Sequence, residues 1–495
     1  MKISRLISLL LIITAACSSE GQRKQNLNKL TTEIDKYVGE AIERQKIPGM
    51  TILATRNDSI IYSRAFGVSS LDTSEPMKIT NVFHWASVSK TFVATAIMQL
   101  REQGKINLDE KITTYLPYFK QKDAFYKDIT LRQMLNHTSG IGDVEDYEWD
   151  KPQHDDAALE RFVRSVADDK MLFAPGKDFS YSNTAFETLG DVIAKVSGVS
   201  FEDYMKRNIF EPLEMNASSF FYKDIPDSLR VSGHVWAMKP ITSDVYPYNR
   251  MHAPSSTLNS NVVEMSHYAI AHLHRGEYKG KRILSDSSYN LLWTNSVNLE
   301  GKPKVGISWF MEDRHGVKTV SHSGGDTGFR SYFLLVPERN ISVMMVSNYE
   351  AFRPIDFAYG VLDIILGEEP VTSTRQIGLE FAEIMKEQGI EKAKEFYRTT
   401  SSDSIQRRYY RWDEDAFGQA GYTLLDRNMF PEAIELFKFN LEQFPNSGYA
   451  YAHLANAYLR AGNNDLAKLN FTKAAELVPE EKYYKEQLAK LSGTK

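Results

Sequence analysis

The sequence predicts an α+β protein, in which an antiparallel sheet flanked by helices carries a helical insert, followed by a C-terminal all-α module. Strand-like runs occur only near the start and the end of the first 367 residues. The stretch between them, residues 87–300, consists mostly of helical patches, and almost no strand pattern follows residue 375. A length of 495 residues agrees with two or three domains, at about 150 residues each.

The first 28 residues precede the predicted fold. A basic start and a short apolar stretch lead to Ala15-Ala16, and Cys17, the chain's only cysteine, follows directly. This order resembles a bacterial lipoprotein signal over residues 1–16, with acylation of Cys17 after export and a polar tether over 17–28. We therefore expect an exported lipoprotein of the cell envelope, held in the outer membrane with its body on the periplasmic or surface face. A plain secretion signal is the alternative.

Residues 29–367 are predicted to form the α+β body. A helical period from Leu27 to Ile42 leads to two strands, 50–55 and 60–66. Three further strands are predicted over residues 318–323, 328–336 and 341–346. An apolar helix over 354–366 closes the body.

Residues 368–495 form the predicted all-α module. The sequence repeats with a period of 34 residues, so that Gly421 corresponds to Ala455 and Phe437 corresponds to Phe471. Small residues recur where two helices would cross closely, which resembles tetratricopeptide repeats, with a capping helix over the last residues, 481–491. Such repeats present a concave surface, so we expect a protein partner through residues 375–495. A generic pair of helical hairpins is the alternative.

Composition excludes several functions. The formal net charge of -5 offers no basic surplus to replace the counterions of nucleic acid, so no nucleic-acid partner is expected. A single cysteine can form neither an internal disulfide nor a cysteine-based metal cage. No Gly-x-Ser-x-Gly elbow, His-Glu-x-x-His helix or phosphate-loop signature occurs. The chemistry should therefore come from Ser, Tyr, His and Lys side chains.

The first chemical motif is Ser87-Val88-Ser89-Lys90, which opens a predicted helix with Val88 and Phe92 on its apolar face. Residues i and i+3 lie on one helical face about 5–6 Å apart, so Lys90 can reach Ser87. A lysine packed at this place tends toward neutrality and can accept the serine proton.

The second motif is Tyr181-Ser182-Asn183. Beside a lysine ammonium, the phenolate of Tyr181 would be stabilised and could also take the serine proton. Asn183 offers both a donor and an acceptor to a substrate amide. Taken alone, the motif also fits an ordinary loop tyrosine with a turn asparagine.

The third motif is His322-Ser323-Gly324-Gly325, predicted at the end of a strand. Glycines at a strand edge let a substrate backbone approach closely. The amides of Gly325 and Ser87 could then converge as an oxyanion hole. Taken alone, His322 also fits a strand-end histidine without a catalytic role.

In this order, the three motifs resemble those of the serine β-lactamase and penicillin-binding protein superfamily. The resemblance covers residues 29–367 and is to the branch with class C β-lactamases, D-alanyl-D-alanine carboxypeptidases, D-aminopeptidases and related esterases. It implies a β-lactamase/transpeptidase-like fold and an acyl-enzyme on Ser87, with Lys90 and Tyr181 sharing the role of base. Which of the two takes the proton stays open. No metal and no cofactor is implied.

The resemblance also implies a substrate-binding set, in which Asn183 and His322 orient a small-molecule or peptide substrate and its carboxylate, next to Gly324 and Gly325. Class C β-lactamases have Lys-Thr-Gly at the third motif, and this chain has none. A histidine carries less charge than a lysine at neutral pH, so efficient β-lactam hydrolysis is not expected. The His-x-Gly form is similar to peptidase and esterase members.

Two functional hypotheses follow from these motifs. The first is a lipid-anchored serine hydrolase acting on amide or ester bonds, chiefly those of D-amino-acid peptides, with a carboxylesterase as the alternative within enzymes. The second is a scaffold or binding protein that acts through its C-terminal repeats while the hydrolase body is catalytically weak or silent.

Overall fold

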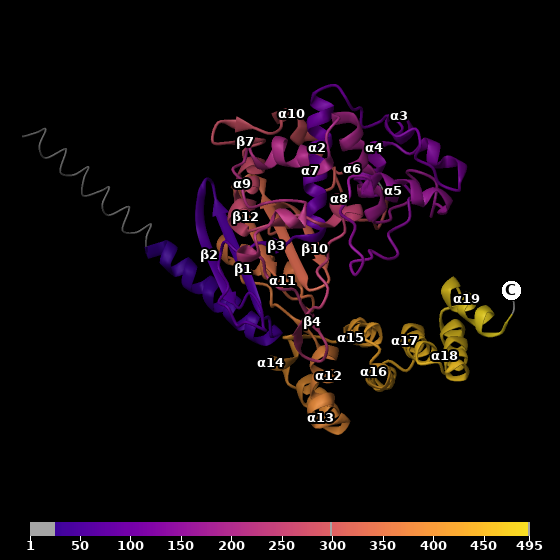
Figure 1. The fold of residues 1–495 in the computed structure, drawn as a ribbon. Coiled ribbons are helices and arrows are strands. Elements are labelled where there is room, and N and C mark those ends of the chain that lie inside the picture. The colour runs from indigo at the N-terminus through magenta and orange to yellow at the C-terminus, as the bar shows by residue number, and fades with distance from the viewer. Residues whose placement is uncertain (1–24, 298, 494–495) are drawn as a thin grey trace, which may run out of the picture. The chain divides into compact units, whose positions relative to one another are not determined.

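The computed structural model describes residues 25–297 and 299–493, which divide into two compact units (Figure 1). The first unit holds residues 25–235 and 242–371, and the second holds 236–241 and 372–493. The predicted signal segment and Cys17 lie outside the described residues, so lipidation stays a prediction.

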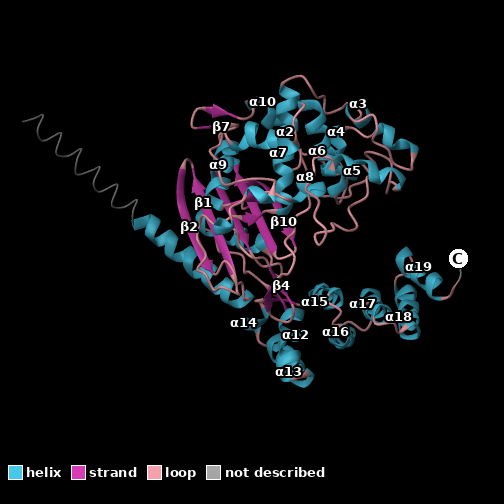
Figure 2. Ribbon diagram, viewed as in Figure 1, coloured by secondary structure: helices cyan, strands magenta, loops and turns pink. Residues whose placement is uncertain are grey.

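A six-stranded antiparallel sheet organises the first unit (Figure 2). Its order is β2-β1-β12-β11-β10-β9. The strands span β1 Gly49–Arg56, β2 Ser59–Gly67, β9 Phe310–Arg314, β10 Val317–Asp326, β11 Phe329–Val336 and β12 Ile341–Ser347. The five predicted strands are confirmed. The prediction missed β9, whose charged sequence, Phe-Met-Glu-Asp-Arg, lacks an apolar run at the sheet edge.

Helices cover both faces of the sheet. Neighbouring residues of a strand point to opposite faces of the sheet, so the side chains of Tyr332 and Phe333 in β11 lie on opposite faces. The ring of Tyr332 lies 6.0 Å from Tyr359 of α11 (Pro354–Leu366), and the ring of Phe333 lies 5.7 Å from Tyr268 of α9 (Val262–Leu273). The sheet is therefore the middle layer of an α+β body, as predicted.

The helical insert lies between β2 and β9 in sequence and joins the sheet in one hydrophobic core. Its central helix is α2 (Ser89–Glu102), in which Ser89 to Leu100 are all buried. The other helices of the insert are α3 Ile112–Tyr115, α4 Leu131–Leu135, α5 Ala158–Ser165, α6 Asn183–Ser197, α7 Phe201–Met205, α8 Ala253–Ser256 and α10 Asp286–Leu292. Short strands β3 (Phe83–His84) and β6 (Asn259–Ser260) pair beside the start of α2. The hairpin strands β7 (Glu277–Tyr278) and β8 (Lys281–Arg282) follow α9.

An N-terminal helix runs over residues 25–45, as the apolar period predicted. It lies next to β2 in Figure 1, where it is drawn in indigo. Tyr62 of β2 donates a hydrogen bond to Asp35 Oδ1 of this helix at 2.8 Å, which ties the helix to the sheet edge.

The second unit is predominantly helical, as predicted. Its helices are α12 Ile377–Gln388, α13 Ile390–Ser402, α14 Ser404–Arg407, α15 Asp415–Asp426, α16 Phe430–Gln443, α17 Gly448–Arg460, α18 Asn464–Leu477 and α19 Lys482–Leu491. A Cβ on Gly421 would lie 2.1 Å from the ring of Phe437, so α15 and α16 cross at a distance only glycine allows. The helices agree with a repeat, whereas membership of the tetratricopeptide class stays a prediction.

A short segment from the middle of the chain completes the second unit. Residues 236–241 belong to it, although they lie more than 130 residues before its helices. They end β4 (His234–Trp236) and begin β5 (Pro240–Thr242). Trp236 is buried and donates from Nε1 to Glu383 Oε1 of α12 at 2.8 Å, and Arg375 donates to the same oxygen at 2.5 Å. Sequence order alone gave no sign of this insertion.

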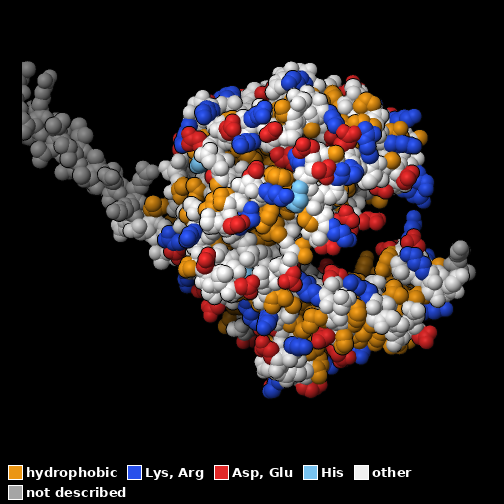
Figure 3. All heavy atoms as spheres, in the orientation of Figure 1, with side chains coloured by type: hydrophobic (Ala, Val, Ile, Leu, Met, Phe, Trp, Pro, Cys, Tyr) orange, Lys and Arg blue, Asp and Glu red, His pale blue; other side chains and the backbone are white. Residues whose placement is uncertain are grey.

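Charged side chains of both signs are intermixed on the face of the molecule shown in Figure 3. Within the part of the chain that the structure describes, no helix combines the length and the apolar character needed to cross a membrane.

Substituting Phe333 tests the core of the sheet. Phe333 is fully buried between Met344 and the helical layer, so we expect Phe333→Ala to lower the free energy of unfolding by about 3–5 kcal/mol. Urea denaturation monitored by tryptophan fluorescence would measure the change. Phe125→Ala is the matched control, because that side chain is 41% exposed and its loss should change stability by less than about 0.5 kcal/mol. Equal effects of the two variants would contradict this assignment of the core.

Candidate active site

Ser87 lies in a tight turn between β3 and α2. The turn is a single 3-10 turn over Ala86–Val88, and Ala86 has a φ of +48°, a left-handed conformation that a non-glycine residue rarely adopts. Ser331 Oγ donates to the carbonyl of Trp85 at 2.8 Å, and Ser89 Oγ donates to that of Ala86 at 2.6 Å. These bonds hold the turn. The motif was predicted to open the helix, but α2 begins two residues later, so Ser87 precedes it.

Lys90 occupies the centre of the site. Its ammonium donates to Ser87 Oγ at 3.0 Å, to Asn183 Oδ1 at 2.5 Å and to the carbonyl of Ser255 at 2.9 Å. The side chain is fully buried. Burial lowers the pKa of Lys90 to about 8, against the opposing effect of the charges of Glu187, Asp326 and Asp143. The three acceptors use all three protons of the ammonium, which fixes the nitrogen beside Ser87.

Tyr181 lies beside Lys90, whose ammonium is 5.0 Å from the centre of the tyrosine ring. Burial raises the pKa of Tyr181 above its ordinary value, and the nearby side chain of Ser87 offsets only part of this rise. In the unliganded site the phenol is therefore a proton donor. The ring of His137 stacks on Tyr181 at 4.3 Å, and His137 Nδ1 accepts from the amide of Ser182 at 3.1 Å.

Asn183 is the first residue of α6, and both the oxygen and the nitrogen of its side-chain amide form hydrogen bonds within the protein. The carbonyl accepts from Lys90, whereas Nδ2 donates to both carboxylate oxygens of Asp143, at 3.0 and 3.1 Å. The two partners fix the orientation of the amide, because an ammonium can only donate and a carboxylate can only accept. In the unliganded site Asn183 positions Lys90. Its predicted contact with the substrate stays a prediction.

A buried carboxylate supports the third contact of Lys90. Glu187 lies one turn after Asn183 on α6 and is fully buried. It accepts from Ser255 Oγ at 2.6 Å and contacts His252 Nδ1 at 3.2 Å. It thereby fixes the residue whose carbonyl receives Lys90.

The third motif lies in the last residues of β10, as predicted. Gly324 and Gly325 pair with Ser331 and Arg330 of β11, so the strand continues to Asp326, three residues beyond the predicted range of 318–323. A Cβ on Gly324 would lie 2.2 Å from the carbonyl oxygen of Trp85. Glycine is therefore required where β10 passes the turn that carries Ser87. An oxyanion hole formed by the amides of Ser87 and Gly325 agrees with this approach and stays a prediction.

His322 contributes no charge to the site. The side chain is buried on β10, and its Nδ1 donates to the carbonyl of Ser323 at 2.7 Å. Burial, followed by the nearby charge of Lys90, lowers the pKa of His322 to about 3, so the ring is neutral at pH 7. A neutral imidazole offers no charge to a substrate carboxylate. The predicted substrate-binding role of His322 stays a prediction.

An imidazole-carboxylate pair lies at the end of β10. His84 Nε2 is 2.7 Å from Asp326 Oδ2, and both side chains are largely buried. The charge of Asp326 acts on both Lys90 and Tyr181, which places the carboxylate close to the reacting groups. Together with Asp143 and Glu187, it makes the surroundings of Lys90 predominantly anionic.

The structure thus brings the three sequence motifs together. Sequence reasoning missed four supporting residues, namely Asp143, Glu187, His84 and Asp326. Glu187 had a usable signal, since it follows Asn183 by four positions and therefore lies on the same face of the helix. Among the described residues, no group of three His, Cys, Asp or Glu side chains is arranged to hold a metal ion.

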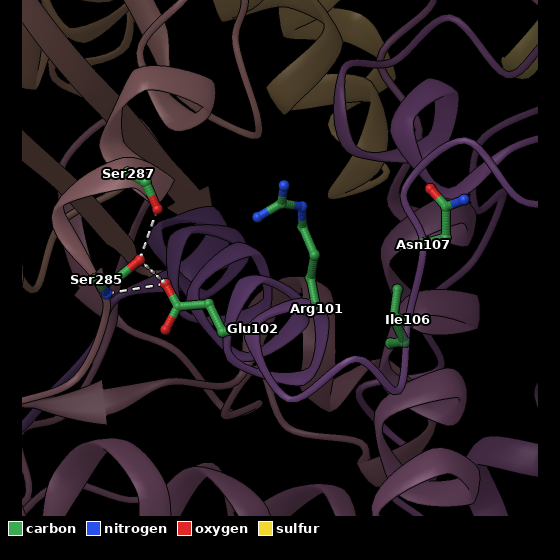
Figure 4. A pocket seen from close by; sticks show the side chains of 6 residues that line it. All are labelled: Arg101, Glu102, Ile106, Asn107, Ser285 and Ser287. Atoms are coloured by element: carbon green, nitrogen blue, oxygen red, sulfur yellow. Dashed lines mark hydrogen bonds between the residues drawn. The ribbon is translucent and has the colours of Figure 1, made fainter.

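A separate cavity of about 660 Å³ lies at the other end of α2 (Figure 4). It is lined by Arg101, Glu102, Ile106, Asn107, Ser285 and Ser287. Glu102 is already engaged there, accepting from the amide and hydroxyl of Ser285 at 2.8 and 2.6 Å. Because α2 is 14 residues long, this cavity lies about 20 Å from Ser87 and is not part of the site.

Comparison with known proteins identifies the family. A model of the β-lactamase family matches residues 34–362, about two-thirds of the chain. The chain therefore belongs to the β-lactamase family, whose members include penicillin-binding proteins and are normally serine hydrolases.

Named relatives agree with this assignment. Protein flp of Staphylococcus aureus (strain N315) is 26% identical over 324 residues, or 65% of this chain and 64% of that protein. The chain thus spans slightly less than two-thirds of the length of that relative. Penicillin-binding protein 4* of Bacillus subtilis (strain 168) is 25% identical over 356 residues, or 66% and 73%. An octameric penicillin-binding protein homologue from Pyrococcus abyssi matches with a TM-score of 0.63 at 25% identity, covering 72% of this chain and 81% of that one.

Substituting Gly324 tests the close approach of β10 to the nucleophile turn. We expect Gly324→Ala to displace that turn, because the new methyl group meets backbone atoms, and to reduce the rate of Ser87 modification by a serine-reactive fluorophosphonate at least 100-fold. Intact-protein mass spectrometry measures the rate. Gly39→Ala is the control, since a Cβ there meets nothing within 4 Å. An unchanged rate for Gly324→Ala would show that the turn does not depend on this contact.

Proposed function

We propose that the chain is a serine hydrolase that forms an acyl-enzyme on Ser87 and acts on amide or ester bonds of D-amino-acid peptides or related small substrates. The observation that carries this proposal is the 3.0 Å contact between Lys90 Nζ and Ser87 Oγ, with the ring of Tyr181 5.0 Å from the same ammonium. A silent scaffold has no need of a buried lysine held by three acceptors. Membership of the β-lactamase family supports the same chemistry.

The proposed reaction begins with neutral Lys90. With its pKa lowered to about 8, about a tenth of Lys90 is neutral at pH 7. The lone pair of Nζ then accepts the proton of Ser87 while Oγ bonds to the substrate carbonyl carbon. The bond to the leaving amine or alcohol breaks next, and this group takes a proton from Tyr181 or Lys90. Water then hydrolyses the ester, which releases the acid and restores Ser87.

The charge around the site favours some substrates over others. His322 is neutral, and three carboxylates surround Lys90, so the site holds little attraction for a substrate carboxylate beside the scissile bond. We propose that β-lactams are at best slow substrates for this reason. Simple carboxylic esters, which need no attraction for a carboxylate beside the scissile bond, are for the same reason the alternative substrate class.

The proposal includes the location and partners. Acylation of Cys17 would place the hydrolase in the cell envelope, anchored to the membrane, and residues 375–495 would bind a protein partner. Metabolic labelling with an alkynyl fatty acid tests the anchor. Incorporation that persists in Cys17→Ser would contradict it.

Replacing Ser87 tests the nucleophile. A fluorescent fluorophosphonate should label the wild-type protein at Ser87, as shown by peptide mapping, and labelling should fall below detection in Ser87→Ala. Ser89→Ala is the matched control within the same motif, because Ser89 Oγ is committed to the carbonyl of Ala86. If Ser87 of the wild-type protein takes up no label, and the protein turns over no peptide, ester or lactam substrate, the serine hydrolase proposal is excluded. The scaffold hypothesis then remains.

The pH dependence tests the base. Only neutral Lys90 accepts a proton, so the rate of Ser87 labelling should rise with pH through about 8 and then level off. Lys90→Arg keeps the charge but stays protonated, so it should reduce the rate at least 100-fold and remove the rise. A rate that is flat between pH 6 and 9 in the wild-type protein would exclude Lys90 as the base.

A further inference from the structure

A second cavity lies within the first unit, and its volume is about 590 Å³. Five aromatic side chains line it together with charged ones: Trp149, His154, Tyr222, Tyr246 and Tyr248, beside Asp150, Lys223, Arg230 and Asp244. Pockets for small organic ligands have volumes of about 300–1,000 Å³ and combine apolar and aromatic side chains with a few polar groups. None of these residues belongs to the three motifs.

One wall of the cavity is joined to the support of Lys90. The indole of Trp149 stacks on Tyr147, with ring centres 4.7 Å apart, and Tyr147 lies 4.9 Å from the ring of His252. His252 contacts Glu187, the carboxylate that fixes Ser255 beneath Lys90. Trp149 is therefore separated from the catalytic lysine by only a few packed side chains.

The opposite wall is joined to the strand that leads into Ser87. The hydroxyl of Tyr246 donates to Asn259 Oδ1 at 2.5 Å, and its ring lies 6.1 Å from that of His84. His84 pairs with Asn259 between β3 and β6, three residues before Ser87. Through packed side chains, one wall is thus joined to the support of Lys90 and the other to the strand that precedes Ser87.

A buried asparagine holds the two loops together. Asn249 is fully buried and donates from Nδ2 to the carbonyls of Tyr147 and Glu148, at 3.3 and 3.4 Å. Its Oδ1 accepts from the amides of Gln153 and Met251, at 3.2 and 3.3 Å. All the hydrogen-bonding positions of this side chain are therefore used to join the two loops. Because the loops are held together without a ligand, the cavity is preformed.

The aromatic side chains of the lining favour a flat ring. Tyr222 and Tyr246 have ring centres 4.4 Å apart, and the guanidinium of Arg230 lies 4.1 Å above Tyr222, so the cation-binding face of that ring is already taken. Arg230 is itself neutralised by Asp227 at 2.5 Å. Aromatic rings bind other rings in edge-to-face or offset-stacked geometry, which adds about 0.5–1.5 kcal/mol to the burial of apolar area.

We propose that this cavity binds an aromatic ring carried on the acyl group of the substrate. The proposal rests on the proposed acylation of Ser87. We assign the acyl side because the acyl group stays bonded to Ser87 through both chemical steps, so a pocket joined to the strand that precedes Ser87 can stabilise it throughout. The natural substrate is then an amide or ester whose acyl part bears an aryl group or an aromatic side chain.

Two sulfonyl fluorides test this assignment with one chemistry. In both, Ser87 Oγ bonds to sulfur, the S–F bond breaks, fluoride leaves and the serine proton passes to the base. Phenylmethanesulfonyl fluoride carries an aromatic ring on the group transferred, whereas methanesulfonyl fluoride carries none. We expect the ratio of their rates of Ser87 modification, measured by intact-protein mass spectrometry on the full chain, to depend on the cavity.

Two variants change the cavity in opposite ways. Trp149→Ala removes an aromatic wall, and Val245→Trp fills the space, since Val245 also lines the cavity. Each should lower the rate with the phenyl reagent at least tenfold, a change equivalent to about 1.4 kcal/mol, and leave the rate with the methyl reagent within twofold. Phe125→Ala, an exposed aromatic residue outside the cavity, should change neither rate.

The outcomes separate this proposal from the proposed function. If neither reagent modifies Ser87 in the wild-type protein, the acyl-enzyme chemistry fails and this assignment fails with it. If both reagents react and the ratio is the same in all variants, the aromatic subsite is wrong while the serine chemistry stands. A parallel loss of both rates in Trp149→Ala and Val245→Trp would also overturn it, by showing a general disturbance of the site.

Discussion

The arrangement of the active site depends on one buried ammonium. Lys90 has no access to solvent, and its three contacts come from separate parts of the chain: Ser87 on the turn before α2, Asn183 at the start of α6, and Ser255 in α8. A buried ammonium needs a hydrogen-bond acceptor for each of its protons. Holding Lys90 therefore requires these three segments to meet, and their meeting creates the site.

The carboxylates around Lys90 set the balance between its charged and neutral forms. Burial alone would make the amine a weak base, whereas Glu187, Asp326 and Asp143 restore part of the preference for the ammonium. None of the three accepts a hydrogen bond from Lys90: Asp143 acts through Asn183, and Glu187 acts through Ser255. The site can therefore bring the pKa of an amine close to neutral pH without a salt bridge that would keep it charged.

Much of this organisation could be predicted from the sequence, because it depends on local spacing. Alternating and helical apolar patterns identified five of the six strands and the all-α C-terminal region, and three short motifs identified Ser87, Lys90 and Tyr181. What the sequence could not show depends on contacts between distant residues. Examples are the pairing of Asn183 with Asp143, 40 positions apart, and of His84 with Asp326, 242 positions apart. The burial of His322, which lowers its pKa, is likewise a property of the folded sheet that local spacing does not show.

The most direct test of the account is the protonation of Lys90 itself. Titration of the protein with its lysines labelled at Cε, followed by ¹³C NMR and assigned with Lys90→Met, would report this pKa without any substrate. The account predicts one lysine that titrates near pH 8, well below the ordinary value of about 10.4, and that is missing from the spectrum of the variant. A Lys90 signal that titrates at pH 10 or above would contradict it, because the amine next to Ser87 could then not serve as the base.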